Sequence, residues 1–167
     1  LLRLFHGAYE VGNRNIGPKG RMRAATLACG PGAVASHRSA GFLHGFLDRA
    51  PVVVDVIAHG QRGRWIDGLR AHQVRRPNPS EVESVDGIPC TTPARTIVDL
   101  AGVVSTRTLR SAFERAAAKK ILDIVAIEAA VRPGIRGVKA LRKLIDQWRK
   151  AAPLARTRGG SCLGGLL

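Results

Sequence analysis

The pattern of apolar positions predicts a mixture of strands and helices up to about residue 93, and helices alone after it. Before that point, short runs rich in β-branched residues predict strands, at residues 52–58, 69–74, 81–85 and 88–90. A further pair of short runs, at 3–5 and 8–11 around Gly7, predicts a hairpin. Two helices are predicted between these runs, at 18–29 and at 37–46, the second with Ser36 as its N-cap.

After residue 93, apolar residues recur every three or four positions, as on the buried side of a helix. The predicted helices begin at Pro93 and cover 106–119, 124–131 and 137–150. Because the connections between the strands are short, we expect 69–74 to return alongside 52–58 in a small, mostly antiparallel sheet. The predicted fold class is α+β, with a hairpin, a helix pair, this sheet and a C-terminal helical bundle.

The segment 86–101 has the most specific local pattern. Asp86 and Gly87 form a turn dipeptide in which glycine accepts a positive φ at low cost, and Pro89 lies in the short strand that follows. Thr92 is placed to cap a helix through its side-chain oxygen, and Pro93 then occupies the first helical position, where a missing N–H costs nothing. The segment therefore predicts a turn, a strand and a sharply started helix.

Arg95 and Asp99 lie four residues apart in that helix, so they share a face and are expected to pair. The segment holds no nucleophile with a neighbouring base. It therefore indicates a scaffold before it indicates any chemistry.

The chain carries a net charge of +15, unevenly distributed. Basic residues outnumber acidic ones by 13 to 8 up to residue 101, and by 14 to 4 after it. A field of this sign attracts polyanions, so we expect nucleic acid as a partner, in a salt-dependent manner. The alternative is that arginine-rich codon usage has placed solvated arginines on the surface. The expected contact residues for nucleic acid or a partner are Arg38, Arg62, Arg64, Lys139, Arg142 and Lys143.

Catalytic and metal sites are not predicted. A restriction-type nuclease needs clustered carboxylates and a lysine, yet no lysine here has an acidic residue two positions earlier. His37 and His44 lie seven residues apart, about 10 Å along a helix, which is too far to share one zinc ion. We also expect no acidic partner for His72. No cofactor is predicted, and three widely spaced cysteines do not suggest a disulfide framework.

The segment Gly87–Ala101 resembles a signature of the AbiEi-type antitoxin family, from type IV toxin–antitoxin systems. Two other stretches agree. Phe5–Gly12 resembles the wing that closes the family's N-terminal winged helix, and Leu27–Phe46 resembles the helix pair that follows. The same layout occurs in actinobacterial proteins that carry a Vsr-like endonuclease domain further along. The resemblance covers roughly residues 1–150.

The resemblance implies two activities. The winged helix would bind promoter DNA as an autorepressor, and the rest of the protein would oppose a nucleotidyltransferase toxin. The expected organisation is a remnant of the wing at 1–12, an AbiEi-like α+β core at 13–150 and a disordered tail at 151–167. Because no recognition helix precedes the hairpin, we expect a chain cut at both ends.

Two alternatives stay open at this point. The chain could be the regulatory N-terminal part of a Vsr-like endonuclease that has lost its catalytic domain, or a general basic scaffold. No apolar run reaches the length of a membrane span and no secretory signal is present, so we expect a cytoplasmic protein without membrane contact.

Overall fold

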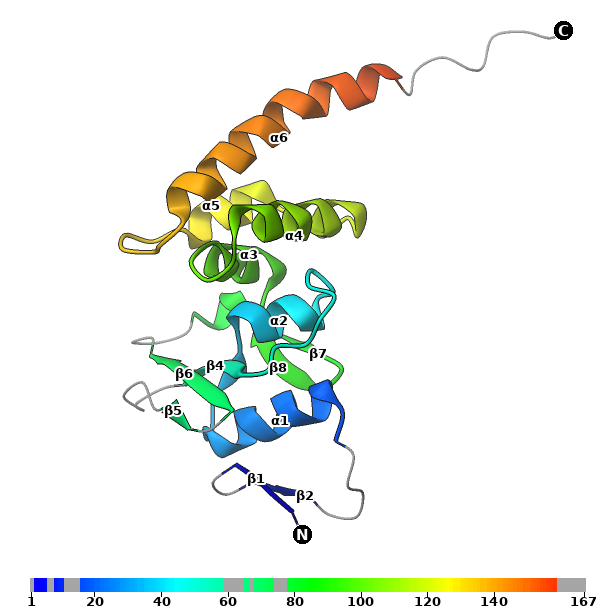
Figure 1. Cartoon of the computed structure of the whole chain (residues 1–167). Helices are drawn as coiled ribbons and strands as arrows, with labels where there is room; N and C mark the ends of the chain where they lie inside the picture. The colour runs from blue at the N-terminus through cyan, green and yellow to red at the C-terminus, as the bar shows by residue number, and fades with distance from the viewer. Residues whose placement is uncertain are drawn as a thin grey trace, which may run out of the picture.

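A mixed β-sheet occupies one part of the molecule and a group of helices the other (Figure 1). The computed structural model describes residues 2–5, 8–10, 16–58, 65–66, 68–73 and 78–158. Six of the described strands form the sheet, in the order β5-β6-β4-β3-β8-β7. Their bounds are Val34–Ala35 (β3), Val54–Ala58 (β4), Trp65–Ile66 (β5), Leu69–Gln73 (β6), Val82–Val85 (β7) and Ile88–Thr91 (β8). The predicted α+β class is confirmed.

The direction of β6 differs from the prediction. β6 runs parallel to β4, with Val54 opposite Leu69 and Ala58 opposite Gln73. β5 is antiparallel to β6 and reverses the chain first, and Gly68 then turns it back with a φ of +74°. The two-residue strand β5 is too short to show an apolar period, so the sequence predicted an antiparallel pairing of β6 with β4. The parallel β3–β8 pairing adds a second crossover, while the β3–β4 and β7–β8 pairs are antiparallel.

The predicted N-terminal hairpin is confirmed as β1 (Leu2–Phe5) and β2 (Ala8–Glu10), paired antiparallel. It packs against α1 (Pro18–Ala28), and the Phe5 side chain is buried in the core beneath the sheet. The hairpin therefore belongs to the sheet half of the molecule.

The remaining described helices match the predicted segments except at their ends. They are α2 (His37–Leu43), α3 (Pro93–Ala101), α4 (Thr106–Ala118), α5 (Ile124–Ala130) and α6 (Val138–Arg158). α2 stops at Leu43, three residues early, because the chain turns at Gly45 with a φ of +73°. α6 extends to Arg158, eight residues beyond the predicted end at 150. Over the described residues, no helix is both long and apolar enough to cross a membrane.

Helix starts show where local signals succeed. The side chains of Ser105 and Asp123 accept from backbone N–H groups in α4 and α5, at 3.2 and 2.9 Å. Thr92 occupies the N-cap of α3 as predicted, but its side chain makes no capping bond, so that part of the prediction is wrong. The hydroxyls of Thr91 and Thr96 bond to each other instead, at 2.7 Å, and hold the start of α3 against the end of β8.

Two separate apolar cores divide the molecule. One lies between the sheet and the helices α1 and α2, around Met22, Val56 and Leu69. The other lies among α3 to α6, around Leu100 and Phe113. In Figure 1 the helices α3 to α6 stack above α2, and the sheet and α1 lie below it. Between the two cores, beside the apolar contact of α2 with α3, lies a group of polar side chains that is called the polar layer below: His37, Asp55, His72, Glu81, Arg95, Asp99 and Arg132.

Candidate functional site

The segment 86–101, whose pattern was the most specific in the sequence, builds the junction between the two halves. Asp86 and Gly87 both adopt left-handed backbone conformations, with φ of +51° and +72°, as the two central positions of a tight hairpin turn require. Pro89 then lies on β8 opposite Ser84. Pro93 stands at the first position of α3 as predicted. The segment thus leads the chain from the sheet directly into the helical half.

Arg95 and Glu81 are the centre of a partly buried ionic network in this junction. The predicted pair of Arg95 with Asp99 is confirmed, with Nε donating to Oδ1 at 2.9 Å. The Nη1 atom of Arg95 donates to Glu81 at 2.9 Å, and Arg132 donates to the other oxygen of Glu81 at 2.7 Å. Glu81 precedes β7 and Arg132 follows α5, so one carboxylate joins the sheet to the helical half.

Asp99 carries an unusual carboxyl in this network. Its side chain is only 5% exposed, and its second oxygen, Oδ2, has no hydrogen-bond partner. Burial raises the pKa of Asp99 to about 6, although the adjacent Arg95 guanidinium acts in the opposite direction. Buried polar atoms without a hydrogen-bond partner are uncommon in folded proteins, so each one needs a specific explanation.

A second polar group joins three segments of the sheet half. His72 on β6 contacts Asp55 on β4, with Nε2 2.8 Å from Oδ1. The ring of His37 stacks on that of His72, with centroids 3.7 Å apart. The Nδ1 atom of His37 lies 2.9 Å from the hydroxyl oxygen of Ser36. Burial lowers the pKa of His37 to about 3, and repulsion from His72 adds to the effect.

The expectation that His72 has no acidic partner is therefore wrong. One signal was available: Asp55 interrupts an otherwise apolar strand, and a buried carboxylate needs a partner. The partner could not be found without the direction of β6. In the parallel register Asp55 stands opposite Arg70, and His72 is its diagonal neighbour.

Both groups border one cavity of about 340 Å³ at the junction. Its polar walls are His37 and His72 from the sheet side and Arg95, Asp99 and Arg136 from the helical side. Gln73, Gly102, Val103 and Ile135 complete the lining. Among the described residues, no three histidine, cysteine or acidic side chains gather into a metal site.

Four of the six predicted contact residues lie in the part of the chain that the structure describes. Arg38 on α2 donates a hydrogen bond to the carbonyl of Val103, so it connects α2 to the end of α3. Arg62 and Arg64 lie outside the described residues. Arg142 on α6 borders a hollow that it shares with Glu128 and Asp146.

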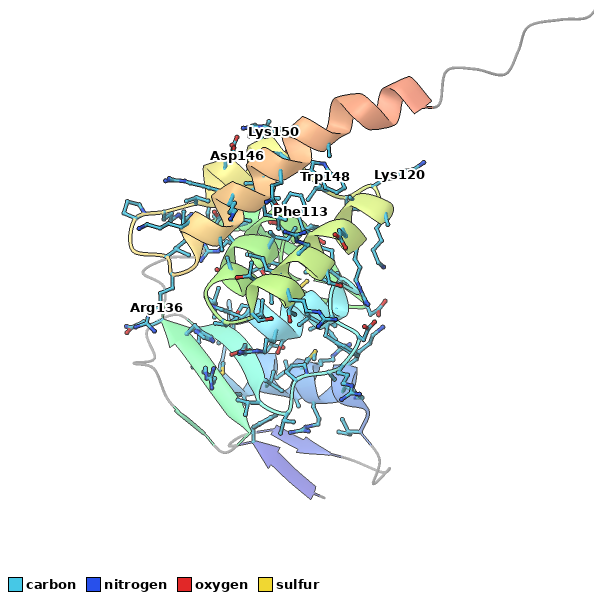
Figure 2. The ribbon with its side chains drawn as sticks, turned by 45° about the horizontal axis from the view of Figure 1, so that its top comes forward. Phe113, Lys120, Arg136, Asp146, Trp148 and Lys150 are labelled. Atoms are coloured by element: carbon cyan, nitrogen blue, oxygen red, sulfur yellow. The ribbon has the colours of Figure 1, made fainter. Side chains whose placement is uncertain are left out.

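Lys139 and Lys143, by contrast, are exposed one turn apart on α6. Lys150 follows at the spacing that returns to the same side of the helix, and these three lysines are called the α6 stripe below. The opposite side of α6 is buried through Leu141 and Ile145. Figure 2 shows Trp148 on the side that faces Phe113, with Asp146 and Lys150 turned away from the body of the molecule.

The chain matches the model of a known protein family. The family model described as AbiEi antitoxin C-terminal domain matches residues 33–147. That range contains the sheet, both polar groups and the first half of α6. No curated protein matches the chain.

Proposed function

The chain belongs to the AbiEi antitoxin family, and on this premise we propose that it opposes a nucleotidyltransferase toxin by direct contact through the α6 stripe. The toxin–antitoxin role follows from the family. The identity of the toxin and the contact surface are our proposal. The proposal gives the chain no reaction centre of its own and requires neither cofactor nor metal.

The composition of the α6 stripe is the observation that carries this proposal. Lys139, Lys143 and Lys150 are all exposed, and Asp146 is the acidic residue that lies among them. Arg149, beside the stripe, is already bound to Glu128 at 2.9 Å. Such a row suits an acidic surface of a partner protein, because interspersed rows of opposite charge steer association and fix its orientation. Arg62 and Arg64 stay predicted contacts from the sequence alone.

Charge reversal tests the proposal directly. The variant K139E/K143E/K150E should lose protection when it is co-expressed with its cognate nucleotidyltransferase toxin, and should no longer co-purify with it. The matched control R107E/K119E/K120E changes the net charge equally, at exposed positions of α4 and the turn after it. It should protect as the parent does. Equal protection by both variants would show that the stripe is not the contact surface.

Nucleic acid is the second candidate partner, favoured by the net charge of +15. Phosphate contacts make such binding fall steeply with salt. A gel shift with duplex DNA from low to high salt separates the candidates. If the stripe variant keeps toxin protection but loses salt-dependent DNA binding, the stripe is a nucleic-acid surface. The relationship to Vsr-like endonucleases stays a prediction, and the gene sequence beyond residue 167 tests it.

A further inference from the structure

We propose that the cavity between the two polar groups binds a phosphate group, either free orthophosphate or the phosphate of a small metabolite. This inference concerns the junction and not the α6 stripe, so it does not rest on the proposed function. It stands on the donors in the cavity wall, on the local charge and on the backbone geometry of His37.

Two guanidinium groups reach the cavity with unused donors. Arg95 is nine-tenths buried, and its Nε and Nη1 atoms are bound to Asp99 and Glu81. Its Nη2 atom has no hydrogen-bond partner among the described residues. Arg136 enters from the loop before α6, is exposed, and likewise has no partner in the part of the chain that is described. Guanidinium groups bind phosphate through paired, charge-assisted hydrogen bonds.

The net charge of the side chains around the cavity favours an anion. Around the cavity, four arginines face three carboxyls, which leaves one net positive charge: Arg38, Arg95, Arg132 and Arg136 against Asp55, Glu81 and Asp99. Because the pKa of Asp99 is raised to about 6, its negative charge is easily neutralised by a proton.

The backbone of His37, in the cavity wall, is held in an unfavourable conformation. His37 has a φ of +47°, which is uncommon for a residue with a side chain. This conformation presents its ring to His72, at the cavity wall. Strained backbone gathers at ligand sites because the surrounding structure holds it ready for binding.

The size of the cavity limits the ligand. About 340 Å³ lies at the small end of the range for ligand pockets, which is about 300–1,000 Å³. A phosphate group with at most a small attached moiety fits this volume better than a polymer. Arg136 lies near the end of β6, where Gln73 also borders the opening, so a ligand would enter between the two halves (Figure 2).

Calorimetric titration of the full chain with orthophosphate, with ionic strength held constant by chloride, tests the proposal. We expect saturable binding with one site. R136A should weaken it about tenfold, the loss expected for one charge-assisted contact. R107A, which removes an exposed arginine of α4 outside the cavity, should bind as the parent does. Amide NMR should place the perturbation at Gly102 and Val103.

Parallel titrations with sulfate and with a small organic monophosphate, glycerol 3-phosphate, identify the source of the phosphate. Tighter binding of the monophosphate assigns the cavity to metabolites, and equal or weaker binding assigns it to the free anion. Either result supports the site if it depends on Arg136. Absence of saturable binding, or equal affinity of R136A and the parent, would overturn the proposal, and toxin protection by the α6 stripe would be unaffected.

Discussion

The carboxyl of Asp99 gives stability an unusual pH dependence. Its pKa is about 6 in the folded chain and 3.8 for the unperturbed group. The folded state therefore binds this proton more tightly than the unfolded state, and stability falls as pH rises from about 4 to 6. The two pKa values differ by an amount that corresponds to about 3 kcal/mol.

The variant D99N removes this proton while keeping the shape of the side chain. Asparagine resembles the protonated carboxyl, so the variant should be close to the parent in stability at pH 4. At pH 7 it should have gained about 3 kcal/mol relative to the parent, because the parent then holds a buried carboxylate. The pairing with Arg95 is already included in this value, since the guanidinium acts on the same pKa.

His37 gives stability the opposite dependence on pH. Its pKa falls from 6.5 to about 3 on folding, so the unfolded state binds the proton more tightly and stability rises between these pH values by about 5 kcal/mol. Between pH 4 and 6 the two slopes nearly cancel in the parent. In D99N the stability should therefore rise with pH over this range, because only His37 then contributes. In H37N it should fall, because only Asp99 contributes; asparagine tolerates the left-handed backbone at this position.

Urea unfolding followed by circular dichroism, at half-unit steps from pH 4 to 7.5 and constant ionic strength, measures these differences. A difference between D99N and the parent that is independent of pH would refute the raised pKa of Asp99. A difference of opposite sign would show that Arg95 outweighs burial. Carbon NMR of the carboxyl gives the pKa directly.

Three further predictions concern the packing of the junction and the helix starts. In G137A the new Cβ would lie 1.8 Å from the last carbonyl oxygen of α3, so the free energy of unfolding in urea should fall by about 3 kcal/mol or more. The control is G134A, where the backbone is also left-handed but the new Cβ meets no atom; it should lose only about 1 kcal/mol. E81A leaves two guanidinium groups without their shared carboxylate and should lose about 3 kcal/mol, a loss that persists at high salt; recovery of the parent midpoint by salt alone would contradict the burial of this network. S105A removes a capping bond and should cost about 1 kcal/mol in thermal unfolding, whereas T92A removes none and should cost less than half of that.

The sequence predicted well those elements whose causes are local. The turn at Asp86–Gly87 needs a positive φ that glycine supplies, and Ser105 and Asp123 bond backbone groups three residues away. Arg95 and Asp99 are one helical turn apart, so their pairing followed from spacing alone.

The polar layer could not be predicted in this way. Glu81 and Arg132 are 51 residues apart, and Asp55 and His72 meet only because a two-residue strand reverses the chain between them. Sequence spacing carries no information on contacts of this kind. The bond of Arg38 to Val103 spans 65 residues and could not be predicted for the same reason.

The polar layer between the two cores also affects how sequences in this family can diverge. Two apolar faces tolerate many exchanges of similar volume, because their contact has no direction. Hydrogen-bonded charges do have direction, and a single change at Glu81 leaves both Arg95 and Arg132 without their shared acceptor. Relatives should therefore change these three positions together, as correlated substitutions, while each core drifts independently of the other.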